Sequence, residues 1–209
     1  MRDLDVILET HYSTTKADSA LESLLRKQKK QSQKKLAGQL RAKSFQKPCR
    51  KLKKQLKHKR WADRHCRNTS MLTTTLAGKQ LQQRYEVILQ QKSTLKLEDE
   101  TALHQLRISI KQLRYGCELL APVLKKKKNT AFIKAMKDLQ DDMGLIHDAS
   151  VQQAMLKDIP EAPRREFSQI AEASRNNSQQ LKSTLATRLT TFSELPLPWA
   201  GLWIEPAND

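Results

Sequence analysis

Apolar residues recur along most of this chain at intervals of three and four, the spacing that places them on one face of an α-helix. Leu21, Leu25, Leu36 and Leu40 follow this pattern over about five turns. The spacing predicts helices over 1–12, 17–42, from about 44 onward, 69–92, 99–121, about 130–143, about 148–159 and 163–191. No segment shows the period of two that is typical of a half-buried strand. We therefore predict an all-α fold of antiparallel helical bundles joined by short loops.

Several predicted helix ends carry local signals. Asp18 or Ser19 is expected to cap helix 17–42, because a short oxygen-bearing side chain can accept from the first exposed N–H groups. Gly144 is predicted to end helix 130–143, since glycine is favoured just after a helix C-terminus. The proline-rich tail 194–209 is expected to be irregular, with Trp199 and Trp203 docking against the helices.

The charge balance turns a helical fold into a candidate polyanion-binding protein. The chain has 39 Lys or Arg and 22 Asp or Glu, giving a formal net charge of +17. Such a protein attracts nucleic acid, anionic lipid or phosphate polymers, and charge alone does not choose among them. Residues 26–67 hold 18 of the basic residues and one acid, Asp63. Leucines are interleaved with these charges, which indicates helices with a basic face rather than a disordered tail.

Cysteine usage and hydropathy argue against other classes. Cys49, Cys66 and Cys117 form no CxxC pair, so we expect reduced thiols in a cytoplasmic protein. His58 and His65 lie near Cys66, but their spacing matches no zinc motif, and we predict no metal and no other cofactor. No apolar run approaches the roughly 20 residues of a membrane-spanning helix, and membrane insertion is not expected.

The strongest candidate site lies on the predicted helix 99–121. His104, Arg107, Lys111 and Arg114, here called the basic stripe, share an arc of about 80° over about 15 Å of helix axis. The arc borders an apolar face formed by Leu103, Leu106, Ile110, Leu113, Cys117 and Leu120. We therefore expect the stripe to lie beside a seam between two helices, where side chains from a neighbouring helix can converge.

The residue types of the basic stripe suit phosphate. Arginine offers forked donors, lysine a point charge, and histidine a donor whose charge depends on pH. No nucleophile with an accompanying acid and base lies in the stripe, which indicates binding rather than catalysis. The alternative interpretation is a solvated basic face with accidental spacing.

Two segments of this region resemble the signature of the CHAD family, a histidine-bearing α-helical domain. The first is LHQLRISIKQLRYGCELL at 103–120, and the second is LQDDMG at 139–144 followed by His147 and Asp148. Asp148 fits the family pattern, whereas His147 departs from it because the family usually has asparagine there. RDLDV at 2–6 resembles the end of the same pattern, and residues 40–45 look similar to a family helix junction. The resemblance covers most of residues 1–190.

The resemblance implies two similar four-helix halves around a basic channel that binds inorganic polyphosphate. It also implies an association with triphosphate-tunnel domains or polyphosphate granules. It divides the chain into an incomplete first half at 1–95, a second half at 96–193 and the tail at 194–209. The first-half equivalent of the stripe helix would lie before Arg2, so we expect the chain to begin partway through that half.

We predict non-enzymatic binding of inorganic polyphosphate, in the cytoplasm and on polyphosphate granules. The predicted contacts are the four residues of the basic stripe together with Lys137, Arg2, Arg26 and Lys29. A nucleic-acid-binding protein that uses residues 26–67 is the alternative, although only Phe45 and Trp61 could stack on bases there. A shortened CHAD remnant with weak binding is the third interpretation.

Overall fold

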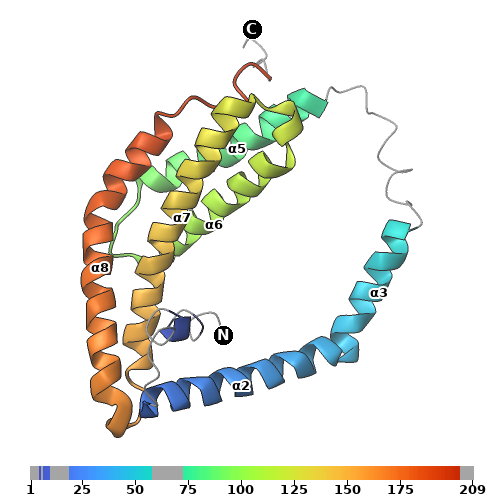
Figure 1. The fold of residues 1–209 in the computed structure, drawn as a ribbon. Helices are drawn as coiled ribbons and strands as arrows, with labels where there is room; N and C mark the ends of the chain where they lie inside the picture. Colours follow the sequence, from blue (N-terminus) through green and yellow to red (C-terminus); the bar gives the residue numbers. More distant parts are fainter. Residues whose placement is uncertain (1–4, 6, 10–18, 58–72, 203–209) are drawn as a thin grey trace. The chain divides into compact units, whose positions relative to one another are not determined.

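The computed structural model describes residues 5, 7–9, 19–57 and 73–202 (Figure 1). Its helices are α2 (Ala20–Arg41), α3 (Lys43–Lys57), α5 (Thr73–Ser93), α6 (Glu100–Leu119), the short 3-10 helix η2 (Ala121–Val123), α7 (Lys126–Met155) and α8 (Glu161–Ser193). No strand occurs among the described residues. The prediction of an all-α fold is confirmed.

These helices belong to two compact units, each built from segments that are distant in the sequence. The larger unit contains residues 70–150 and 172–209, and the smaller unit contains residues 1–69 and 151–171. The long helices α7 and α8 therefore contribute to both units. The predicted division at 1–95, 96–193 and 194–209 follows the sequence repeat instead of this packing, and it stays a prediction.

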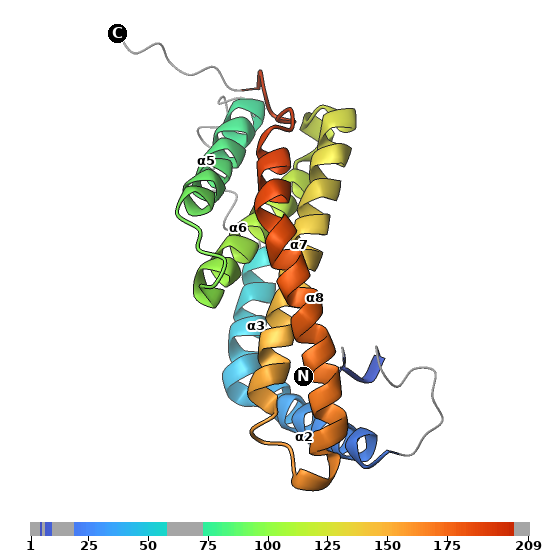
Figure 2. The same ribbon diagram turned by 90° about the vertical axis from the view of Figure 1, so that its left-hand side faces the viewer.

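The core of the larger unit is formed by apolar side chains of α5, α6, α7 and α8, which are gathered into a bundle in both views (Figures 1 and 2). From α6 it takes Leu103, Leu106, Ile110, Leu113 and Cys117, all buried. These are five of the six residues predicted for the apolar face of this helix, and Leu120 packs against the same core in a partly buried position. The helical spacing therefore identified the buried side of α6 correctly.

An aromatic cluster closes one end of this core. Phe132 contacts Phe192 and Trp199 with ring centroids 4.8 and 5.3 Å apart. Trp199 is buried, and its indole N–H donates to Oε1 of Gln82 at 2.9 Å. The predicted docking of the tail through Trp199 is confirmed, whereas Trp203 lies outside the described residues.

Local capping and a close helix contact set the position of α6. The Asp99 side chain accepts from the Ala102 N–H at 2.9 Å and so caps the first turn of the helix. Near the other end, a Cβ added to Gly116 would lie 2.8 Å from a methyl carbon of the buried Leu81 on α5. Glycine therefore allows α5 and α6 to approach closely at this turn.

The long helix α7 differs from its prediction. One helix was predicted to end at Gly144 and the next to begin near Asp148, but a single helix runs from Lys126 to Met155. The predicted break is wrong. Glycine in a helix interior costs only about 1 kcal/mol relative to alanine. Met143 and Ile146, on either side of the glycine, are both buried in the core, and burying such side chains is worth about 1.5–3 kcal/mol each.

The smaller unit has its own core, and α2 enters it through its first two turns. Leu21 and Leu25 are completely buried there against residues that include Ile159 and Phe167. Ser19 caps α2, as predicted, and accepts from the Glu22 N–H at 3.0 Å. The apolar spacing of α2 continues beyond this core, because Leu36 and Leu40 are 40% and 45% exposed.

The helix α3 is amphipathic but buries none of its residues. It contains seven Lys or Arg and no acid, and Phe45, Leu52 and Leu56 are exposed large hydrophobic side chains. Pro48 lies inside the helix as its sixth residue, just beyond the first turn. The prediction that the basic segment is helical holds for residues 26–57, apart from the junction at Ala42, and residues 58–67 lie outside the described residues.

Candidate functional site

The basic stripe lies along α6, beside the buried face of that helix. His104 and Lys111 are exposed, whereas Arg107 and Arg114 are partly buried. The two arginines are therefore held against the protein while their charged groups stay near the surface. This placement agrees with a seam position and not with a face that points fully into solvent.

The neighbouring helix at this seam is α7. The ring of His104 lies 5.6 Å from the ring of His147, measured between centroids. Nε of Arg107 donates a long hydrogen bond of 3.5 Å to the backbone carbonyl of Gln140, and Nε of Arg114 donates to the Gln140 side-chain oxygen at 3.2 Å. Residues of the stripe thus meet one face of α7 over two turns, from 140 to 147.

Gln140 positions both arginines of the stripe. Its side chain is only 9% exposed, and it accepts from Arg114 through Oε1 and from Arg107 through its backbone oxygen. Its Nε2 is buried without a hydrogen-bond partner. A buried polar group of this kind costs stability, so the contact with the arginines is made at some expense to the fold.

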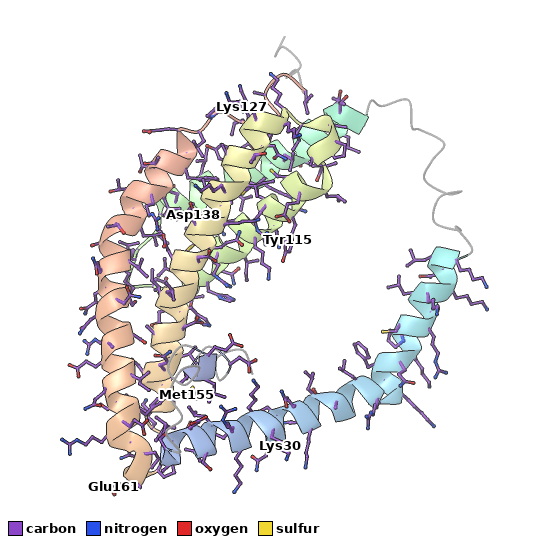
Figure 3. The ribbon with its side chains drawn as sticks, viewed as in Figure 1. Lys30, Tyr115, Lys127, Asp138, Met155 and Glu161 are labelled. Carbon is purple, nitrogen blue, oxygen red and sulfur yellow. The ribbon has the colours of Figure 1, made fainter. Side chains whose placement is uncertain are left out.

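Arg114 is the most constrained member of the stripe. Its side chain is 16% exposed, and its Nη1 forms an ion pair with Glu118 at 2.7 Å. The guanidinium also lies 4.6 Å from the centre of the Tyr115 ring, on the exposed side of α6 (Figure 3). The Lys111 ammonium approaches the same ring at 5.8 Å. The Tyr115 ring is therefore approached by two cations of the stripe.

The other three residues of the stripe differ from Arg114 in their ion pairing. Among the described residues, His104, Arg107 and Lys111 form no ion pair. The acids of α7 explain part of this, because Asp142 pairs with Arg188 of α8 instead. Asp138 lies beside Arg188 in a separate pocket (Figure 3). The charges of Arg107 and Lys111 are therefore not neutralised by an ion pair among the described residues.

A small pocket lies at the His104 end of the stripe. It is lined by His104 and Arg107 from α6 and by His147 and Ser150 from α7, together with Glu100 and three apolar residues. The Ser150 hydroxyl donates to the Glu100 carboxylate at 2.6 Å. The two helices are thus joined here by a polar contact beside the pair of imidazoles.

Lys137 can be placed by the register of the two helices. His104 of α6 meets His147 of α7, and Arg107 and Arg114 both reach Gln140, so the helices run in opposite directions. Arg114 follows His104 by ten residues on α6, and Lys137 precedes His147 by ten residues on α7. Lys137 is exposed and lies on the part of α7 level with Arg114.

The remaining predicted contacts belong to the smaller unit. Lys29 forms an ion pair with Asp5 at 2.5 Å, and Arg26 pairs with Glu22 at 2.5 Å one turn away on α2. Lys29 projects onto the apolar face of α2, and the carboxylate of Asp5 explains how a charge is tolerated there. Arg2 lies outside the described residues. The proposed role of these three residues in anion binding stays a prediction.

The chemistry of the described residues offers no other strong candidate. No group of three or more His, Cys, Asp or Glu is arranged to hold a metal ion in the part of the chain that the structure describes. Burial, with a smaller contribution from Glu118, raises the pKa of the Cys117 thiol to about 12. This thiol is therefore protonated near neutral pH and is a poor nucleophile or metal ligand. No described helix is long and apolar enough to cross a membrane.

Sequence reasoning missed three residues at the seam: His147 as a contact of the stripe, Gln140 as the anchor of its arginines and Glu118 as the partner of Arg114. Two signals were present. Glu118 follows Arg114 by four residues on the same predicted helix. Gln140 and His147 are seven residues apart and therefore share one face of a helix. The predicted end of the helix at Gly144 concealed the second signal, because it separated Gln140 from His147.

Comparison with known proteins adds one finding. The family model described as "CHAD domain" matches residues 1–157 of the chain. No curated protein and no solved structure gives a significant match. The matched residues include the whole of α6 and all of α7.

Proposed function

The chain belongs to the CHAD family, and from this premise we propose that its larger unit binds inorganic polyphosphate without catalysing its turnover. Domains of this family are associated with polyphosphate binding in general. The proposal for this chain rests on its own residues, the four members of the basic stripe. The cellular location that follows from it is the cytoplasm, including polyphosphate granules.

One observation carries the proposal. Three of the four residues of the stripe have no ion-pair partner among the described residues, although they lie along one seam beside a packed core. Arginine and lysine side chains that are held in place lose less conformational freedom when they bind than those on a mobile surface. The stripe therefore offers an anion a partly preorganised row of donors.

The length of the stripe favours a chain of phosphates over a single one. Ten residues of helix separate His104 from Arg114, which corresponds to about 15 Å along the axis. A single phosphate can contact only one or two of these residues. A linear polymer with one negative charge or more per phosphate can contact all four, and its affinity should fall steeply with added salt.

The test compares two double variants with the same change of charge. Arg107→Gln with Arg114→Gln removes the arginines of the stripe, and Arg165→Gln with Arg175→Gln removes two exposed arginines of α8. We expect the stripe variant to lose about a hundredfold in affinity for long-chain polyphosphate, from two charge-assisted contacts of about 1.5 kcal/mol each. The α8 variant should lose only a few-fold, and circular dichroism should show both variants to be as helical as the wild type.

Two results would overturn the proposal. Equal polyphosphate affinity of the stripe variant and the wild type would remove the stripe as the site. Release of orthophosphate from polyphosphate by the pure protein would contradict binding without turnover. A competition experiment distinguishes this proposal from nucleic-acid binding. Polyphosphate should displace RNA at a much lower phosphate concentration than RNA needs to displace polyphosphate.

A further inference from the structure

We infer that His147 is a second imidazole of the anion site, and that with His104 it couples polyphosphate binding to proton uptake. This inference rests on the proposed function and adds to it a residue from α7 and a form of regulation. It concerns the small pocket at the His104 end of the basic stripe.

The geometry of the two rings supports a shared ligand. Their centroids are 5.6 Å apart and their planes are inclined by 40°, so the rings are close without being stacked face to face. Both side chains are exposed, and both line the same pocket as Arg107. A phosphate group at the mouth of this pocket can therefore accept from His104 and His147 together while it contacts the guanidinium of Arg107.

The fixed charges around the rings nearly cancel. Apart from the two histidines, the charged residues that line the pocket are Glu100 and Arg107, both on α6. On α7, the next residue, Asp148, is buried and does not line the pocket. One carboxylate and one guanidinium sum to zero, so the net charge at this end of the stripe depends on how many imidazoles are protonated.

Protonation and anion binding therefore favour each other. Two imidazolium rings at this separation repel, and a phosphate between them replaces the repulsion with two charge-assisted hydrogen bonds. Each proton comes from the buffer when the phosphate binds and returns to it when the phosphate leaves. By linkage, binding that takes up protons strengthens as the pH falls, and histidine is the side chain that titrates in the physiological range.

The consequence is that polyphosphate affinity decreases gradually as the pH rises. The arginines and the lysine of the stripe hold the polymer in neutral and mildly basic solution. The imidazole pair contributes affinity that increases as the pH falls. Polyphosphate should thus bind at least about tenfold more tightly near pH 6 than near pH 8, the value of one of these two charge-assisted hydrogen bonds.

The experiment is calorimetric titration of the full chain with polyphosphate of defined length near pH 7, in two buffers that differ in ionisation enthalpy. The difference in apparent binding enthalpy gives the number of protons taken up. We expect net uptake by the wild type and clearly less by His147→Asn. The variant His147→Lys carries a permanent charge, and it should bind more tightly than the wild type near pH 8 with a weaker dependence on pH.

The outcomes separate this inference from the proposed function. If the wild type binds polyphosphate near pH 8 but His147→Asn takes up as many protons as the wild type, the paired site is wrong and the proposed function stands. If the wild type binds no polyphosphate at any pH, both are wrong. His147 is exposed, so its replacement should not unfold the chain, and the thermal unfolding midpoint of each variant checks this.

Discussion

Helices α3 and α6 are both rich in positive charge, but they use it differently. α3 has seven Lys or Arg, no acid and no buried residue. α6 has fewer cations, and they border a face whose five core residues are all buried. In α6 the core holds the arginines beside α7, so the charges have defined positions. The comparison teaches that the density of charge along a sequence is a poor guide to an anion site, and that packing beside the charge is a better one.

The same contrast exists between two cysteines, and it gives the largest effect we expect. Burial raises the pKa of Cys117 in α6 to about 12, whereas Cys49 in α3 is exposed. In a Cys66→Ser background at pH 8, a thiol reagent should modify Cys49 at least about a hundredfold faster than Cys117. The measurement is the labelling rate at each site by mass spectrometry, and similar rates would contradict the described core of α6.

The raised pKa of Cys117 also predicts how the free energy of unfolding changes with pH. The folded pKa lies above the ordinary value of 9.0. The contribution of the protonated thiol is therefore fully present below about pH 9 and is lost as the pH rises from there towards 12. Urea unfolding of the wild type and of Cys117→Ala at pH 8 and pH 10 checks this, because only the wild type should lose stability through this group.

A single lysine in each helix tests the contrast in binding. Lys111→Gln should weaken polyphosphate binding by about tenfold, because it removes a cation of the stripe. Lys53→Gln removes the same charge from the exposed surface of α3 and should change affinity less than about threefold. The dependence of affinity on salt concentration should also become shallower only for Lys111→Gln. Equal losses would mean that the total charge matters and the seam does not.

The smallest expected effect concerns Glu118, the acid that pairs with the stripe among the described residues. Glu118 pairs with Arg114 at 2.7 Å and competes with any phosphate for that guanidinium. Glu118→Gln should tighten polyphosphate binding a few-fold, about the value of one partly exposed ion pair. Glu86→Gln on α5 makes the same change of charge and serves as the control. A gain of the same size for both variants would assign the effect to net charge.

Several features could be predicted from the sequence because they depend on local spacing or on one side chain. The apolar face of α6 repeats every three to four residues, and so does the stripe beside it. Ser19 could be predicted as a cap because its hydroxyl accepts from an N–H three residues away. The role of Trp199 followed from its size and its place in an irregular tail.

The end of helix α7 could not be predicted by the same means. Gly144 has a weak local preference for ending a helix, and this preference was outweighed by burial of Met143 and Ile146. Local preference is worth about 1 kcal/mol, while the packing of a few core side chains is worth several times that. Once the helix is continuous, Gln140 and His147 lie on one face of it.

The sequence by itself determined that this chain is helical, that it is strongly basic and that the four residues of the basic stripe share one side of α6. The tertiary structure alone decided that Lys29 pairs with Asp5, whereas Arg26 and Arg114 pair with acids four residues away on their own helices. It also brought His147 to His104 across 43 residues of sequence. The physical reason is that helical periodicity acts within a few turns, whereas contacts between helices are selected by the burial of whole faces.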